Sequence, residues 1–196
     1  MEELLAEFEA HSPTLAAQAR RRIPLAELGW VLQALIDERA PLVRVGDIVK
    51  ALMKRPPSPL AAARLALGPD LVRPYLDDEE TLHVIGVSRL VEAQLARGYY
   101  RTFFRELEAE MSRLSVRPFP FVLLCSDEVR HAVRRRVHPL YPNLPVIAWN
   151  EIHFDRTGVG VNTVGLIKTP EDIRNFYRMA DSYRKWKARA ARKGQI

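Results

Sequence analysis

The sequence contains little of what marks a disulfide scaffold, a membrane protein or a secreted precursor. Cys125 is its single cysteine among 196 residues, so it allows no intrachain disulfide and no multi-cysteine zinc site. Its longest apolar stretches, such as residues 119–125, fall far short of the ~18 residues that a membrane span requires. The N-terminal segment is acidic and lacks the basic and apolar regions of a signal peptide. We therefore expect a soluble chain from a reducing compartment.

Motifs for catalysis, metal binding and phosphate binding are scarce as well. The five histidines are scattered without a metal-ligand spacing, and Gly158 and Gly160 lack the other glycines of a phosphate loop. Residues 77–80 are four successive acids, which favour a solvated turn because they cannot converge on one cation without a tight loop. We expect no cofactor, no metal and no enzymatic activity.

One enzymatic hypothesis stays open. Cys125 and Ser126 occupy a predicted strand-to-helix turn, which is a place where a nucleophile can sit. A free cysteine more often behaves as a small buried hydrophobe, so we expect a structural role for Cys125.

The charge of the chain is unevenly distributed. Hydrophobic residues make up 47% of the sequence and charged residues 28%, with a formal net charge of +6. Residues 1–167 hold 21 basic and 21 acidic side chains, so the whole positive excess lies in residues 168–196. A body without net charge attracts phosphate poorly, whereas the basic tail alone is able to attract a polyanion.

Apolar periodicity predicts a helical N-terminal half. A short amphipathic segment from residue 4 ends near Ser12, and Pro24 opens a stronger helix as its first-turn proline. A helix that begins near residue 60 is expected to stop at Gly68 and Pro69, with a short helix behind it. Other helices are predicted over residues 45–55, 88–98 and 100–114, with one short strand at 82–86.

The second half has a different pattern. Apolar runs over residues 119–125, 144–149 and 158–167 predict three further strands. A helix follows Ser126, and we expect Arg130 and residues 134–136 on its outer face. A helical lead followed by strand, helix, strand and strand predicts an α+β fold, in which an all-helical subdomain precedes a small α/β subdomain.

The last segment predicts a basic amphipathic helix. Thr169 and Asp172 resemble a capping box, with Pro170 at the first helical position. Docking of its aromatic stripe on the chain's own domain is the expected role. Binding of a partner or a polyanion is the alternative, and its candidate residues are Tyr177, Tyr183, Lys185 and Trp186. The predicted boundaries are 1–98 for the helical subdomain, 99–117 for a connecting helix, 118–167 for the α/β subdomain and 168–196 for the basic C-terminal helix.

Two blocks of the sequence resemble a known family. In the first, a helix ends in Leu/Ile-x-Glu-Arg, and after a short loop a second helix carries Asp-Ile-x-x-x-Leu. These positions are Leu35, Ile36, Glu38, Arg39, Asp47, Ile48 and Leu52. In the second, an arginine-rich helix is followed by Pro-x-Leu-Pro-Val and Asn-Glu-Ile. These positions are Pro142, Leu144, Pro145, Val146, Asn150, Glu151 and Ile152.

Together the blocks resemble the C-terminal cytoplasmic part of the large export-gate protein of type III secretion systems, the flagellum, hypersensitive response and invasion protein export pore family. The resemblance covers roughly residues 4–167 and implies the third and fourth cytoplasmic subdomains. It implies a non-enzymatic scaffold at the cytoplasmic face of the inner membrane, which forms a ring with other copies. The implied partners are other subunits of the export apparatus and chaperone–substrate complexes, in a flagellar or a virulence system. The alternative is a reduced homologue that binds nucleic acid or another polyanion through the basic C-terminal helix.

Two groups of residues are candidate contacts. Arg39, Arg44 and Asp47 surround a predicted helix–helix loop, where charges can pair across a subunit boundary; solvated loop charges are the alternative. Tyr141, Pro142 and Trp149 lie near a strand entry. Tyrosine and tryptophan there can anchor a partner, although we expect them to pack in the core.

Overall fold

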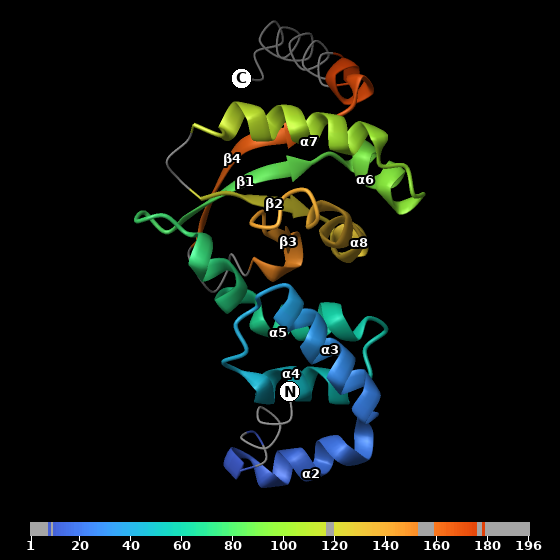
Figure 1. Ribbon diagram of the computed structural model, residues 1–196, viewed down its shortest axis with the longest axis vertical. Helices are drawn as coiled ribbons and strands as arrows, with labels where there is room; N and C mark the ends of the chain where they lie inside the picture. The colour runs from blue at the N-terminus through green and yellow to red at the C-terminus, as the bar shows by residue number, and fades with distance from the viewer. Residues whose placement is uncertain (1–7, 9, 117–119, 153–158, 176–177, 179–196) are drawn as a thin grey trace, which may run out of the picture. The chain divides into compact units, whose positions relative to one another are not determined.

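A computed structural model describes residues 8, 10–116, 120–152, 159–175 and 178 (Figure 1). The chain divides into two compact units. The helical unit consists of Met1–Leu82 and Ile147–Val161, and the sheet unit of His83–Val146 and Asn162–Ile196. The chain passes from one unit to the other within three strands. Helices and a small sheet occur together, so the predicted α+β class is confirmed.

The helical unit is built around one central helix. Its elements are α2 (Pro13–Arg22), α3 (Leu25–Asp37), α4 (Val45–Met53), α5 (Pro59–Val72) and the short 3-10 helices η1 (Arg73–Tyr75) and η2 (Trp149–Glu151). Helix α5 packs against α3, α4 and η2. The helical spacing of Leu28, Val31, Leu32 and Leu35 places these side chains on the buried face of α3. Burial of this face holds α3 in the unit.

Helix α2 was not predicted. Helical structure ends at His11, just before Ser12 as predicted, and Pro13 then starts α2, because a proline in the first turn needs no N–H partner. The buried residues of α2 are Ala16 and Ala19, which leave no visible apolar stripe in the sequence. Helix α3 begins at Leu25, with Pro24 as its N-cap rather than its first-turn residue.

The predicted stop at Gly68 and Pro69 is wrong. Helix α5 continues through Pro69 to Val72, and η1 follows without a break. A proline inside a helix removes one backbone N–H donor. Burial of Leu67 and Leu71 on either side of it compensates, because packing of apolar side chains decides helical stability in a protein.

The four strands form one sheet with the order β3-β2-β1-β4. Their bounds are β1 Thr81–Val87, β2 Val122–Cys125, β3 Val146–Ala148 and β4 Gly160–Ile167. Strands β1 and β2 are parallel, with Val84 opposite Val122. The N–H of Gly160 donates to the carbonyl of Glu80 (3.1 Å) at one end of β4, and the N–H of Ser88 donates to the carbonyl of Ile167 (2.9 Å) at the other. Strand β4 therefore runs in the same direction as β1, and all four predicted strands exist.

In the sheet unit, three helices pack on a common core: α6 (Arg89–Ala96), α7 (Arg101–Leu114) and α8 (Asp127–Val137). Figure 1 shows α7 lying along β1 and β4. Phe103, Leu107 and Leu123 are completely buried in this core. Ser88 caps α6 as predicted, since its hydroxyl accepts a hydrogen bond from the N–H of Val91 (3.3 Å).

The expected outer face of α8 needs correction. Arg130 and Arg134 are buried, with 2% and 7% of their surface exposed, whereas Arg135 and Arg136 are exposed. The guanidinium of Arg134 donates from Nη1 to the carbonyl of Leu144 (3.1 Å), which explains how it is accommodated. Long aliphatic stems allow arginine to cover apolar surface while the charged group finds a partner.

Within the described part of the chain, no helix combines the length and the apolar character needed to cross a bilayer.

Candidate functional site

Arg64, on α5, is a buried cation of the helical unit, with 3% of its surface exposed. Its Nε and Nη2 donate to the two carboxylate oxygens of Glu151 in η2, at 2.7 and 2.8 Å. Its Nη1 donates to Oε2 of Glu38, the C-cap residue of α3, at 2.6 Å. One guanidinium thus connects three elements of the unit, through a bidentate and a single charged hydrogen bond. We call these three residues the Arg64 centre.

The surroundings of Arg64 favour its charged form. Burial by itself lowers the pKa of Arg64, but the hydrogen bond to Glu151 and the charges of Glu151 and Glu38 raise it, and the net pKa is raised. Glu151 Oε2 also accepts the backbone N–H of Ala148 (3.0 Å), which fixes η2 to the same centre. Because its polar atoms have partners, the desolvation of these charges is offset.

The Arg64 centre explains why the two sequence blocks occur together. Glu38 belongs to the first block and lies 26 positions before Arg64, and Glu151 belongs to the second and lies 87 positions after it. A glutamate from each block therefore binds the same buried guanidinium, that of Arg64. Sequence analysis missed Arg64. The signal for it was present, since it is the one charged residue in the apolar run of residues 60–68.

The candidate subunit-contact residues lie at the start of α4. Arg44 Nε binds Asp70 Oδ2 of α5 at 2.6 Å, and its Nη2 donates to the carbonyl of Ala66 at 3.0 Å. Asp47 pairs with Lys50 at 3.2 Å. The bonds of Arg44 connect the start of α4 to α5, although the side chains of Arg44 and Asp47 remain 40% and 41% exposed. A role between subunits stays a prediction for both.

Arg39 differs from the other two candidate subunit contacts. It follows α3 as an exposed residue with φ of +56°, a left-handed conformation that a non-glycine residue adopts at some energetic cost. Its backbone N–H closes the turn by donating to the carbonyl of Ile36 (2.8 Å).

The predicted aromatic group is divided between the two units. Tyr141 is partly buried and packs against the core of the sheet unit, and Pro142 beside it is exposed. Trp149 lies in η2 of the helical unit, with 46% of its surface exposed. Tyr141 therefore packs in a core, as expected, whereas Pro142 and Trp149, for which core packing was also expected, are exposed to solvent.

The start of the basic C-terminal helix has the predicted capping box. The N–H and hydroxyl of Thr169 donate to Asp172 Oδ2 (2.6 and 2.8 Å), and the N–H of Asp172 donates to the hydroxyl of Thr169 (3.1 Å). The hydroxyl of Ser88 also donates to Asp172 Oδ2 (2.8 Å) and connects this helix to the start of α6. Residues 170–175 are helical. The candidate residues Tyr177, Tyr183, Lys185 and Trp186 lie outside the described residues.

Cys125 is a buried cysteine at the end of β2, with 0% of its surface exposed, as expected. Its neighbour Ser126 donates its backbone N–H to Glu92 Oε1 of α6 (2.5 Å). The acidic run at residues 77–80 forms the expected solvated turn, in which Asp78, Glu79 and Glu80 are exposed. Across the described ranges, no three side chains of histidine, cysteine, aspartate or glutamate are grouped so that they could hold a metal ion.

Fold and site together define an α+β protein of two units, with a buried ion-pair centre in the helical unit. The FHIPEP family matches this chain over residues 1–157, and the chain belongs to that family. The family predicted from the two sequence blocks is thereby confirmed. The chain is similar to the flagellar biosynthesis protein FlhA of Bacillus subtilis (strain 168), with 28% identity over 119 residues. This match covers 53% of the chain and 17% of the length of FlhA.

Solved structures of related proteins have the same fold. The Shigella flexneri MxiA protein superposes with a TM-score of 0.73 at 20% identity, covering 85% of this chain and 57% of that one. The C-terminal domain of InvA gives 0.72 at 21% identity and covers 85% and 56%. Nonameric EPEC SctV-C gives 0.71 at 16% identity and covers 85% and 55%. The chain therefore spans little more than half of these solved chains, and at such identities the likeness shows the fold.

Proposed function

We propose that this chain is a cytoplasmic scaffold of a type III export gate, in a flagellar or a virulence system, and acts through protein–protein contacts. The observation that carries the proposal is the family match over residues 1–157, together with the fold shared with the C-terminal domain of InvA. The Arg64 centre supports it physically, because both sequence blocks of the family serve to build one rigid helical unit.

The proposed role includes a ring of copies at the inner-membrane face that receives chaperone–substrate complexes. Two solved relatives support assembly: EPEC SctV-C is nonameric, and Chlamydia pneumoniae CdsV has been solved in complex with CdsO. Arg39, Arg44 and Asp47 remain candidate contacts between copies, and Trp149, with 46% of its surface exposed, remains a candidate contact for a partner.

Two measurements test this function. The full chain, attached by an N-terminal tag to a lipid monolayer, is expected to form closed rings that are visible by electron microscopy. The same chain on a biosensor should bind chaperone–substrate complexes from its own organism more tightly than the chaperones alone. Discrete particles without rings, together with equal binding to an unrelated acidic protein, would contradict the proposal.

The uneven charge favours one second candidate, binding of a polyanion through the basic C-terminal helix. Residues 168–196 carry the whole positive excess of the chain. Binding of single-stranded nucleic acid should then weaken steeply with salt and vanish on removal of these residues, because neutralised phosphates release counterions. Binding that is insensitive to salt would exclude this candidate.

A further inference from the structure

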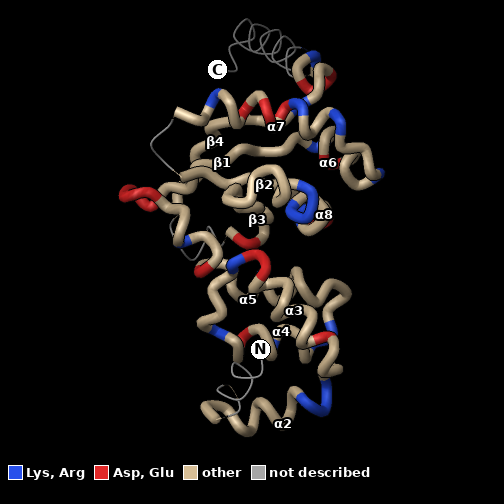
Figure 2. Tube along the Cα trace, in the orientation of Figure 1, with Lys and Arg blue, Asp and Glu red and all other residues tan. Residues whose placement is uncertain are grey.

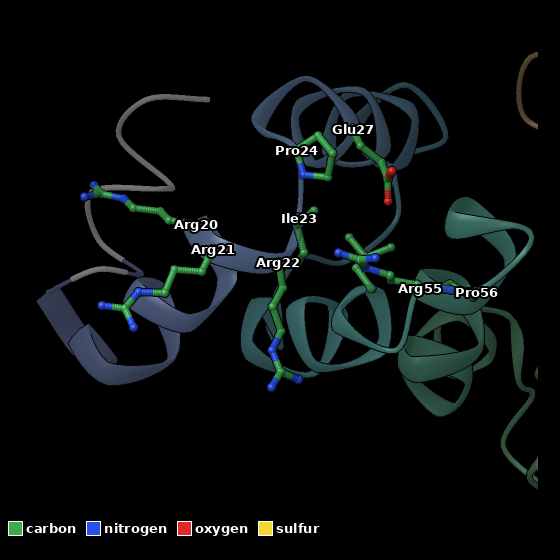
Figure 3. A pocket seen from close by; sticks show the side chains of 9 residues that line it. Arg20, Arg21, Arg22, Ile23, Pro24, Glu27, Arg55 and Pro56 are labelled. Atoms are coloured by element: carbon green, nitrogen blue, oxygen red, sulfur yellow. The ribbon is translucent and has the colours of Figure 1, made fainter.

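The helical unit contains a pocket that none of the features above uses. It has a volume of about 480 Å³ and lies where α2 meets α3, beside the C-terminal end of α4 (Figure 3). The buried residues Ile23 and Leu52 contribute apolar surface, and Pro24 and Pro56 border it. An apolar surface of this kind can bury the stem of a bound side chain.

The border of the pocket is strongly basic. Its charged lining residues are Arg20, Arg21, Arg22, Arg55 and Glu27, an excess of three formal positive charges. All four arginines are exposed. In Figure 3 the guanidinium groups of Arg20, Arg21 and Arg22 spread outward, while that of Arg55 lies near the centre and faces Glu27. We call this site the basic pocket.

The spread of the arginines limits what the basic pocket can bind. One small anion needs donors that converge on it, as in a phosphate-binding nest. Guanidinium groups that point in different directions instead match several carboxylates distributed along a polypeptide. The chemistry of the basic pocket therefore favours an acidic segment of a protein.

The helical unit also presents such a segment, in the turn that precedes β1. Asp77 Oδ1 accepts the backbone N–H groups of Glu79 (2.9 Å) and Thr81 (2.8 Å), so Asp77 orders the turn. Asp78, Glu79 and Glu80 are exposed at its tip. We call residues 78–80 the acidic turn. An ordered turn loses little entropy when its carboxylates are bound.

The two charged surfaces lie apart from each other in the helical unit. Figure 2 shows the acidic turn, in red, at the left, and the arginines of the basic pocket, in blue, at the lower right. A separation seen in projection can only be larger in space, so the two surfaces do not meet within one chain. Two different, complementary patches on one subunit are what a head-to-tail contact requires, and such contacts close into a ring when the rotation permits.

We propose that the basic pocket receives the acidic turn of a second copy of this chain. The inference rests on the proposed ring and adds the contact that joins neighbouring copies. Arg21, Arg22 and Arg55 form no ion pair within the described part of the chain, so their charges are available to the incoming carboxylates. Complementary charge would fix the orientation and register of the contact.

Charge reversal on either side tests this contact. The full chain is followed by sedimentation velocity over a concentration series in low salt. Reversal of the pocket (R21E, R22E and R55E) or of the turn (D78K and E79K) should weaken self-association at least about tenfold, since like charges then face each other. A chain that carries both reversals should regain wild-type association. All five residues are exposed, and melting temperatures close to wild type would show that each variant is folded.

A matched control reverses two exposed arginines of the sheet unit, R97E and R101E, and should leave association unchanged. The inference is overturned if the wild-type chain stays monomeric at millimolar concentration, or if the doubly reversed chain does not regain association. Rings that form regardless of both reversals would refute this contact and keep the proposed function. Association that follows the reversals without any ring would refute the ring and keep the contact.

Discussion

Two arginines of the helical unit hold carboxylates at the same distance but in different surroundings. Arg64 binds Glu38 at 2.6 Å and Arg44 binds Asp70 at 2.6 Å. The side chain of Arg64 is 3% exposed, whereas that of Arg44 is 40% exposed. Water screens the exposed pair, so this pair contributes little to the free energy of folding. In the buried pair the attraction is stronger, but it is opposed by the large cost of removing both charges from water.

The comparison separates two functions of charge in one unit. At the Arg64 centre, charge is enclosed and connects α3, α5 and η2, so its loss should affect folding. At Arg44 and at the basic pocket, charge is exposed, so its loss should affect contacts more than folding. The distance between the charged atoms does not distinguish a structural ion pair from an exposed one, whereas the burial of the side chains does.

The largest effect is expected for Glu151→Ala. This change leaves Arg64 buried with Glu38 as its remaining carboxylate, and it also removes the acceptor of the Ala148 N–H. Removal of one partner from a buried ion pair costs about 3 to 5 kcal/mol, which is a large fraction of the stability of a domain. Urea denaturation measures it, with Asp70→Ala as the matched control at the exposed pair. Equal losses in the two variants would show that burial does not determine the cost of losing a carboxylate.

Replacement of both partners should cost less than removal of one. In Arg64→Met with Glu151→Leu, no unpaired guanidinium remains in the interior, and Glu38 at the border of the site is able to reach water. We expect this double variant to regain about 2 kcal/mol relative to Glu151→Ala, because buried ion pairs are often replaceable by apolar residues. The same urea titration measures the difference. A double variant as unstable as the single one would show that packing, and not the unpaired charge, causes the loss.

The Arg64 centre also shows the limit of sequence analysis. Glu38 and Glu151 could be selected as members of two blocks and Arg64 as a charge in an apolar run, but their pairing could not be predicted. Nothing in a one-dimensional pattern joins positions 87 residues apart. The prediction that Arg130 and Arg134 lie on the outer face of α8 was wrong for the same reason. An arginine in an amphipathic pattern is taken as solvated, and only the fold shows that its charged group has a buried partner.

Elements with strong local signals were predictable. Helix α7 has large apolar side chains at helical spacing, and β2 is a continuous apolar run, so both were located to within a few residues. Helix α2 buries alanines, and α5 contains Gly68 and Pro69, so their local signals were absent or misleading. The basic pocket lies at the junction of α2 and α3. Because α2 was not predicted, the pocket could not be predicted from the sequence either.

The sheet unit offers a third kind of carboxylate, held by neutral donors. Burial raises the pKa of Asp172. Hydrogen bonds from the backbone N–H and hydroxyl of Thr169 and from the hydroxyl of Ser88 lower this pKa by a larger amount, so the net pKa is lowered. A carboxyl group whose pKa is lower in the folded state stabilises the fold at pH values above its unfolded pKa of about 3.9. This stabilisation is lost as the pH falls through the folded-state pKa.

Asp172→Asn should therefore cost about 1 kcal/mol at neutral pH, as the loss of a helix cap does. The difference from wild type should shrink as pH falls below about 4. Thermal melts across this pH range measure it, and Glu171→Gln, an exposed neighbour, is the control with little effect. A difference that stays constant down to low pH would show that the carboxylate charge plays no part.

The smallest effect is expected for Arg44→Ala. The variant loses the pair with Asp70 and the hydrogen bond to the Ala66 carbonyl, but water is able to solvate both groups that remain. We expect a loss of about 0.5 to 1 kcal/mol that decreases further in high salt, because exposed pairs are screened. Urea denaturation at low and high salt measures it, with Lys50→Ala as a control at a pair that is more exposed. A loss above about 3 kcal/mol that ignores salt would place Arg44 with Arg64, among the charges that hold the fold.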